Sequence, residues 1–247
     1  MKRAAPLLAV ALLGGCAYFN GIYNARQAER RADKLAARGR DGEAAGLYGT
    51  AAIKAETVLV RHAKSGWAHD ALYLAGRGWA FSNQCERALP RLDAYLALPG
   101  QPAARRNRAA LAIGMCNVRL GHHEVARDML RPLLASRDHE LTSAAAIWAA
   151  RASIGVGETD SALAYLRSAG VAAAEWELAT AYLGQRRHAS AESLLVSRAQ
   201  RGDFRREVLD AIGTLWAAGR EKGVLRLTSA YDASRLRQVD RARLHLL

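Results

Sequence analysis

The residues that most often carry out chemistry are few in this chain, and their spacing suits neither a reaction nor a metal. The seven histidines contain no pair four residues apart, the helical spacing of many zinc sites. His122 and His123 are adjacent in a predicted turn. The chain has no Gly-x-Ser-x-Gly nucleophile motif and no Gly-rich phosphate loop. We therefore expect no catalytic residue, metal site, cofactor or small-molecule substrate.

One short motif resembles an enzyme. Glu192-Ser193 is similar to the Glu-Ser pair of lytic transglycosylases, some of which carry helical solenoids. Here it falls inside a predicted helix, and no other motif of that catalytic domain follows. We predict a solvated helix surface at this pair.

Cys16 has the most specific chemical context in the chain. Two basic residues and an apolar run over 4–13 precede it, the order of a secretory signal. The run is too short to span a bilayer, which takes about 20 residues. The segment Leu13-Gly14-Gly15-Cys16 resembles the bacterial lipobox, which implies cleavage before Cys16 and acylation of that cysteine; the alternative is an ordinary signal with an incidental cysteine. Ala17 is not the Asp of inner-membrane retention signals, so the resemblance implies the periplasmic face of the outer membrane.

The composition predicts a basic, helical protein. The net charge is +13, and removing residues 1–15 leaves 232 residues with +11. Such a charge suits acidic partners or an anionic lipid surface, or reflects codon bias. Export disfavours nucleic acid. Basic residues at a spacing of four line one face of the first predicted helix: Arg26, Arg30, Lys34 and Arg38. This face either contacts lipid headgroups or is simply solvated.

A four-position motif recurs along the chain: a small residue, an apolar or aromatic residue three later, a small residue twelve later, and a large apolar residue four after that. Turn residues separate its two helical halves. The copies are Ala32, Leu35, Ala44, Tyr48; Gly76, Trp79, Ala88, Leu92; Gly114, Asn117, Ala126, Leu130; Ala150, Ser153, Ala162, Leu166; Ala179, Tyr182, Ala191, Leu195; and a weaker one around Ile212 or Gly213, Trp216 and Leu225. Asn117 and Ser153 depart from the pattern.

This pattern resembles the tetratricopeptide repeat. The second small residue advances by 44, 38, 36 and 29 residues, around the 34 of that family. The resemblance implies an all-α fold, a helical-hairpin solenoid of about six repeats over 22–247, after a signal peptide at 1–15 and an anchor with a short linker at 16–21. Residues 234–247 are predicted to form a capping helix. A non-repetitive helical bundle is the alternative.

The two remaining cysteines, Cys85 and Cys116, fall in adjacent predicted helices that pack antiparallel. An oxidising periplasm permits a disulfide between them, which would close a loop of 31 residues. The alternative is two buried thiols, since free cysteine is often buried.

Repeat proteins of this family bind extended peptides on the concave face, which the first helix of each hairpin lines. Counting from the first small residue of each copy places arginines of three successive copies on that face. The expected groove residues are Tyr73, Arg77, Phe81, Met115, Arg119, Arg151 and Trp176. Guanidinium groups bind carboxylates, and aromatic side chains provide apolar anchors. The hypothesis is a groove for an acidic, partly apolar peptide; the alternative is a solvated rim.

A lipobox followed by helical repeats resembles outer-membrane assembly lipoproteins of the BamD type. That resemblance implies a scaffold that holds envelope proteins rather than an enzyme. Other repeat lipoproteins share this architecture, and fold alone does not decide function. The alternative is a cell-wall (peptidoglycan) enzyme or a factor associated with one.

Overall fold

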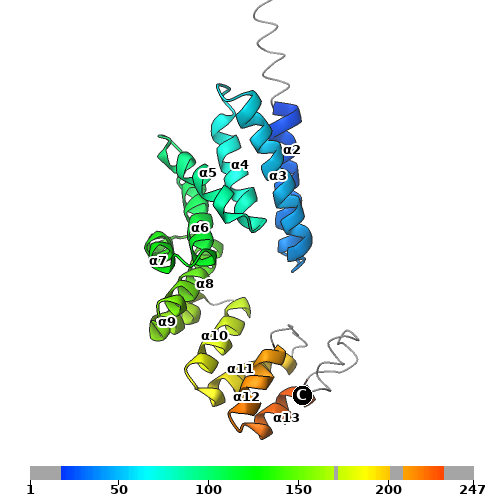
Figure 1. Cartoon of the computed structure of the whole chain (residues 1–247), viewed down its shortest axis with the longest axis vertical. Coiled ribbons are helices and arrows are strands. Elements are labelled where there is room, and N and C mark those ends of the chain that lie inside the picture. The colour runs from blue at the N-terminus through cyan, green and yellow to red at the C-terminus, as the bar shows by residue number, and fades with distance from the viewer. Residues whose placement is uncertain (1–17, 170–171, 201–207, 231–247) are drawn as a thin grey trace, which may run out of the picture. The chain divides into compact units, whose positions relative to one another are not determined.

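The computed structural model of the chain describes residues 18–169, 172–200 and 208–230. All regular structure in these ranges is helical. The elements are η1 (a π-helix, Tyr18–Tyr23), α2 (Asn24–Ala36), α3 (Asp41–Arg61), α4 (Ala68–Phe81), α5 (Cys85–Ala97), α6 (Ala103–Arg119), α7 (His123–Leu130), η2 (a 3₁₀-helix, Arg131–Ala135), α8 (His139–Gly155), α9 (Thr159–Ala169), α10 (Ala172–Gly184), α11 (His188–Gln200), α12 (Val208–Ala217) and α13 (Glu221–Ala230) (Figure 1). The predicted signal peptide, Cys16 and the predicted capping helix lie outside the described residues.

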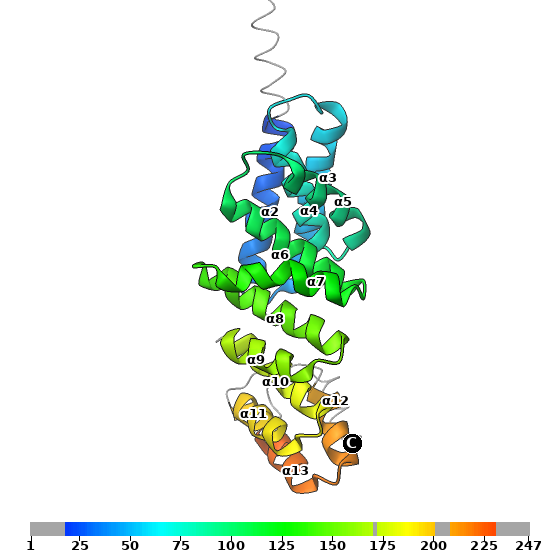
Figure 2. The ribbon, with the colours of Figure 1, turned by 90° about the vertical axis from the view of Figure 1, so that its left-hand side faces the viewer.

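The chain divides into two compact units, one ending at Trp148 and one beginning at Ala149. In the N-terminal unit α2 packs on α3, α4 on α5 and α6 on α7; in the C-terminal unit α10 packs on α11 and α12 on α13 (Figure 2). Helices consecutive in the chain are therefore neighbours in space, as expected for an all-helical repeat.

Six turns share one backbone conformation. Each contains one residue with a positive φ: Gly39, Asn83, Gly121, Gly157, Arg186 and Gly219. The N–H of the next residue donates to the carbonyl five residues earlier, in the pairs Arg40 to Leu35, Gln84 to Trp79, His122 to Asn117, Glu158 to Ser153, Arg187 to Tyr182 and Arg220 to Leu215. This is the Schellman motif, which ends a helix by turning the chain through the left-handed region. The same turn thus closes six helical hairpins.

The turns also correct the predicted register of the sixth copy of the motif. In copies one to five the carbonyl acceptor is the second motif residue, whereas in the sixth it is Leu215 instead of Trp216. Leu215 is buried and Trp216 is 54% exposed, and Val224 is buried where Leu225 is 65% exposed. The sixth copy therefore starts at Ile212, and the assignment of Trp216 and Leu225 was one residue late. Two adjacent apolar residues in each helix concealed the register.

The small motif residues let the two helices of a hairpin approach closely. A Cβ atom on Gly76 would lie 2.6 Å from Cγ of Leu92, and one on Gly114 would lie 2.6 Å from Cγ of Leu130. The first and fourth motif positions therefore pack against each other within a hairpin. Because interiors are close-packed, even a methyl group here requires a neighbour to move.

Candidate partner-binding site

A polar cleft lies on the N-terminal unit where α2, α4 and α6, the first helices of three successive hairpins, come together. Its volume is about 200 Å³, and its lining is mostly charged: Glu29, Asp33, Asp70, Tyr73, Leu74, Arg77, Arg105 and Arg108. Of the seven predicted groove residues, Tyr73 and Arg77 line it.

Asp70 links the beginnings of the three helices. Arg26 of α2 donates to one of its carboxylate oxygens at 2.7 Å, and Arg105 of α6 donates to the other. Asp70 itself lies at the start of α4, where the partial positive charge of the helix N-terminus also favours a carboxylate. Its negative charge is thus shared by two guanidinium groups.

Arg77 forms the second ionic cluster of the cleft. It donates to Glu29 at 2.6 Å and to Asp33 at 2.8 Å, and its guanidinium group lies 5.4 Å from the ring of Tyr48 and 4.9 Å from that of Phe81. Burial alone would lower the pKa of Arg77, but Glu29 and Asp33 raise it above its usual value. Arg77 therefore stays charged inside the fold.

Two tyrosines of this region are kept neutral. Burial raises the pKa of Tyr48, and its hydrogen bond to Asp33 raises it further. The hydroxyl of Tyr48 donates to that carboxylate at 2.5 Å. Burial also raises the pKa of Tyr73, although Arg77 opposes the shift. Both phenols therefore stay protonated.

Each of the three predicted groove arginines binds its own chain. Arg77 joins α4 to α2 as described. Arg119 of α6 donates to the carbonyl of Ala80 in α4 at 2.6 Å and lies over the ring of Trp148. Arg151 of α8 pairs with Glu177 of α10. Arginines one or five positions after the first small residue of their copies thus connect the first helices of neighbouring hairpins.

The predicted apolar groove residues are mainly core residues. Tyr73, Met115 and Trp176 are 7%, 2% and 8% exposed. Tyr73 packs its ring against Tyr95, with the centroids 5.2 Å apart. Phe81 is partly buried beneath Arg77. A ligand would reach Tyr73 only at the edge that lines the cleft, and it would not reach Met115 without rearrangement.

Arg108 is the cleft residue that sequence reasoning missed and that suits a partner best. It is exposed, lines the cleft, and forms no ion pair with any residue in the described ranges. Glu29, Asp33, Asp70 and Arg105 were also missed as site residues. Glu29 and Asp33 are four residues apart, and this spacing was the available sign that both lie on one face of α2.

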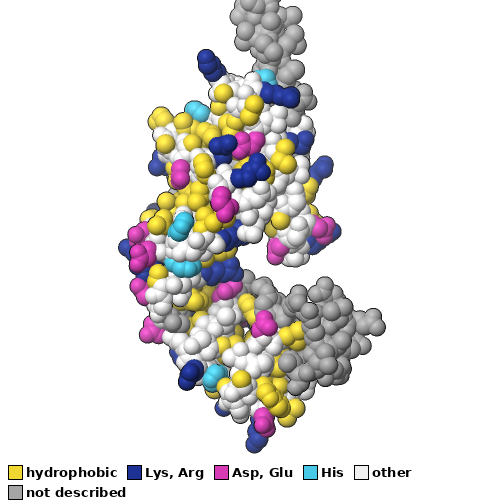
Figure 3. Space-filling view, in the orientation of Figure 1, with side chains coloured by type: hydrophobic (Ala, Val, Ile, Leu, Met, Phe, Trp, Pro, Cys, Tyr) yellow, Lys and Arg dark blue, Asp and Glu magenta, His cyan; other side chains and the backbone are white. Residues whose placement is uncertain are grey.

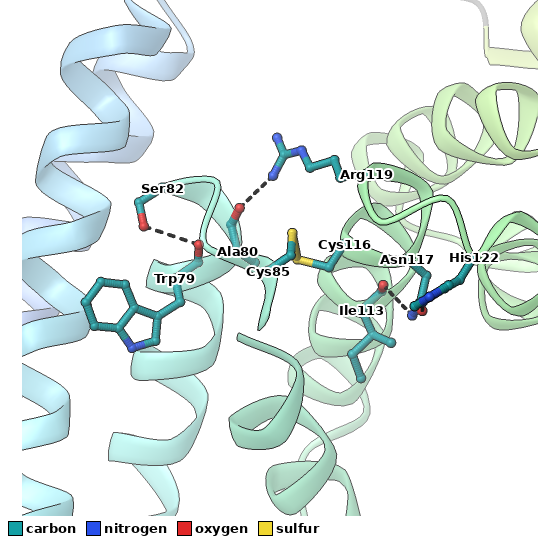
Figure 4. Close-up of a disulfide and its surroundings, with 9 residues drawn as sticks. All are labelled: Trp79, Ala80, Ser82, Cys85, Ile113, Cys116, Asn117, Arg119 and His122. Carbon is teal, nitrogen blue, oxygen red and sulfur yellow. Dashed lines mark hydrogen bonds between the residues drawn. A yellow bond between two sulfur atoms is a disulfide. The ribbon is translucent and has the colours of Figure 1, made fainter. Parts of the chain in front are cut away.

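Cys85 and Cys116 form a disulfide between the start of α5 and the end of α6, with their Cα atoms 5.1 Å apart (Figure 4). Nearby, Arg119 donates to the carbonyl of Ala80, and Asn117 donates to that of Ile113. Both sulfur-bearing residues are almost fully buried. The bridge joins the second hairpin to the third beside the arginine contact between α6 and α4.

Glu192 differs from its prediction as a solvated residue. Its side chain is 5% exposed and accepts hydrogen bonds from Arg220, at 2.9 Å, and from Arg226. A small cavity of about 390 Å³ adjoins this cluster. Glu192 therefore joins α11 to α13 in the C-terminal unit, where its charge is neutralised. Only Ser193 of the pair is exposed.

Comparison of the chain with models of known protein families found no match, and comparison with curated proteins found none. Within the described ranges, no cluster of three or more His, Cys, Asp or Glu side chains is arranged to hold a metal ion. None of the described helices is both long and apolar enough to cross a membrane.

Proposed function

We propose that this chain is a lipid-anchored scaffold built of tetratricopeptide-like hairpins. It holds other envelope proteins at the periplasmic face of the outer membrane and acts in the assembly of outer-membrane proteins. The observation that carries the proposal is the sixfold recurrence of one hairpin, with the same Schellman turn each time. Stacked helical hairpins expose extended surfaces that suit peptide binding. The lipobox-like segment before Cys16 supports the anchor.

The partner that fits the cleft is an acidic, extended segment. Three arginines, Arg26, Arg77 and Arg105, balance the three carboxylates of the cleft. Arg108 has no carboxylate of its own among the described residues. A carboxylate of the partner would complete this charge pattern and bind bidentately. Arg108 thus takes the role that was predicted for Arg77, Arg119 and Arg151.

Site-specific photocrosslinking in intact cells tests the scaffold and the cleft together. A photoreactive residue at Arg108 should capture a defined partner, whereas the same residue at Arg38, exposed at the other end of α2, should not. Capture of a large outer-membrane barrel protein would support barrel assembly, and capture of a peptidoglycan synthase or hydrolase would favour the cell-wall role. Absence of any adduct from position 108 would overturn the cleft assignment.

The anchor has a separate test. Cells fed labelled palmitate should incorporate the label into the wild-type protein and not into a Cys16→Ser variant, and the variant should be soluble or remain an unprocessed precursor. A wild-type protein that takes up no label and stays soluble would contradict the lipid anchor without bearing on the cleft.

A further inference from the structure

One end of the N-terminal unit is defined by the beginnings of three helices. The bridge from Arg26 through Asp70 to Arg105 places the starts of α2, α4 and α6 side by side. The α3–α4 connection at 62–67 and the α5–α6 connection at 98–102 therefore lie at the same end as η1. We call this end, comprising η1, residues 60–69 and residues 98–106, the entry end.

The entry end is basic and almost free of acidic residues. Arg61, Lys64 and Arg106 are exposed, and none of them forms an ion pair with a residue that the structure describes. The stretches 57–69 and 94–123 contain no Asp or Glu. The nearby Asp70 is already neutralised by Arg26 and Arg105. Dark-blue Lys and Arg side chains project at this end in Figure 3.

The opposite end of the same hairpins has a different charge pattern. The second helix of each hairpin begins there with acidic residues in its first turn: Asp41 and Glu43 in α3, Glu86 in α5 and Glu124 in α7. At the entry end, the N-termini of α4 and α6 add partial positive charge to the basic side chains. Acidic residues thus offset part of the basic charge of Lys34, Arg38 and Arg40 at the opposite end, whereas the exposed basic residues of the entry end have no such neighbours in the sequence.

The chain also enters the fold at this end. Ile22 of η1 is fully buried, and a Cβ atom on Gly21 would collide with Val58 of α3, so η1 packs tightly on α3. Tyr18, the first described residue, follows Cys16 by two positions. Two residues span at most about 7 Å. Acyl chains on Cys16 would therefore hold Tyr18, at the start of η1, within about this distance of Cys16 and bring the entry end toward the bilayer.

Apolar and aromatic side chains accompany the basic ones. Val60 is 81% exposed, and Trp67 lies in the α3–α4 connection with the guanidinium group of Arg26 5.9 Å from its ring. Tryptophan is enriched at membrane–water interfaces, and basic residues near an anionic leaflet are attracted to its headgroups.

We propose that the entry end binds anionic phospholipid headgroups through Arg61, Lys64 and Arg106, so that this end of the N-terminal unit lies against the membrane. The proposal deepens the proposed scaffold function, because it uses the anchor at Cys16 to bring the surface to the bilayer. The headgroup attraction itself needs no acyl chain, which separates its test from that of the anchor.

Vesicle flotation of the full chain carrying Cys16→Ser tests the surface. The probes are vesicles of phosphatidylcholine alone and vesicles with phosphatidylglycerol added. The test variant is Arg61→Gln/Lys64→Gln/Arg106→Gln. The control is Lys34→Gln/Arg38→Gln/Arg40→Gln, which removes the same formal charge at and just after the other end of α2; of these residues Arg40 pairs with Glu43. That helix of 13 residues is about 20 Å long, well beyond the screening length of about 8 Å at physiological salt.

Each basic residue near an anionic surface contributes about fivefold in binding. We expect the test variant to bind phosphatidylglycerol vesicles at least tenfold more weakly than its parent, the control to stay within about twofold, and all three proteins to bind phosphatidylcholine alike. Equal losses in both variants would show attraction by net charge alone and overturn the proposal. Unchanged vesicle binding by the test variant would also overturn the proposal. Crosslinks to a partner protein from position 61 or 106 without vesicle binding would overturn it too, because the entry end would then be a protein interface.

Discussion

The N-terminal and C-terminal units use the same hairpin and the same turn, but different contacts hold neighbouring hairpins together. In the N-terminal unit the disulfide, the Arg77 cluster and the Asp70 bridge all join one hairpin to the next. In the C-terminal unit Arg151–Glu177 and the Glu192 cluster have this role, and both involve arginines that are more exposed than Arg77. The repeat thus specifies each hairpin, whereas the contacts at each interface between hairpins are different.

The largest difference between the units should come from their arginines. Arg77→Met leaves Glu29 and Asp33 without their cation, and the side chains of Arg77 and Glu29 are only 15% and 17% exposed. We expect the free energy of unfolding to fall by about 3 kcal/mol. This is the low end of the range for a broken buried ion pair, because Asp33 is 45% exposed. Arg151→Met removes a more exposed arginine but leaves Glu177, which is 17% exposed, without its cation, so we expect a smaller loss of about 1–2 kcal/mol.

Hydrogen exchange read separately on peptides of α4 and α10 measures both losses, since local opening energies differ along a chain. The triple variant Glu29→Gln/Asp33→Asn/Arg77→Met removes all three charges and should recover much of the loss. If Arg77→Met and Arg151→Met destabilise their units equally, the proposed contrast between the interfaces fails.

Removing the disulfide should affect the N-terminal unit almost as strongly. The variant Cys85→Ala/Cys116→Ala frees a loop of 31 residues, so the chain-entropy estimate is a loss of about 3–4 kcal/mol. Urea unfolding with and without reductant would show it, and the variant itself should not respond to the reductant. Two thiols that react with an alkylating agent in the native, oxidised protein would refute the bridge.

Glycine substitutions should separate packed from open positions of the hairpin. Gly76→Ala brings a methyl group against Leu92 and should cost about 1–3 kcal/mol. Gly213→Ala in α12 meets no atom within 4 Å, so lower chain entropy in the unfolded state should make it neutral or stabilising by up to about 1 kcal/mol. Thermal unfolding of the two variants measures the contrast, and a stabilising Gly76→Ala would contradict the close helix contact.

The smallest expected effect is a pH dependence at Glu56 of the N-terminal unit. Burial raises the pKa of Glu56, but hydrogen bonds from Arg91 and Trp79 outweigh it and lower the pKa below its ordinary value of 4.5. The ionised form therefore stabilises the fold above pH 4.5, and this contribution is lost as the pH falls through the lowered pKa. Glu56→Gln should thus cost more stability at pH 7 than at pH 3.

Denaturant titrations at the two pH values test this, and Glu86→Gln at an exposed position controls for loss of a negative charge. A cost of Glu56→Gln that is the same at both pH values would show that its ion pair with Arg91 contributes nothing.

The helical hairpins and most of their registers could be predicted from the amino-acid sequence alone. Glycine in the turns supplied the left-handed conformation without steric cost, at Gly39 and Gly121 for example, and the twelve-residue offset paired small residues with large ones, such as Gly76 with Leu92. These features depend on neighbours within one hairpin, so the order of residues along the chain is enough to predict them.

The partners of the charged residues, by contrast, depend on how the hairpins pack and could not be predicted from the sequence. Arg77 and Arg119 were expected to face a ligand, yet they bind α2 and α4, while Glu192 was expected in solvent and is buried. A shift of one residue turns a helix face by about 100°, and a guanidinium group reaches whichever carboxylate or carbonyl the next hairpin presents. The two residues of each contact are far apart in the sequence: 44 residues for Arg77–Asp33, 39 for Arg119–Ala80 and 28 for Arg220–Glu192. No local sequence pattern therefore encodes these contacts.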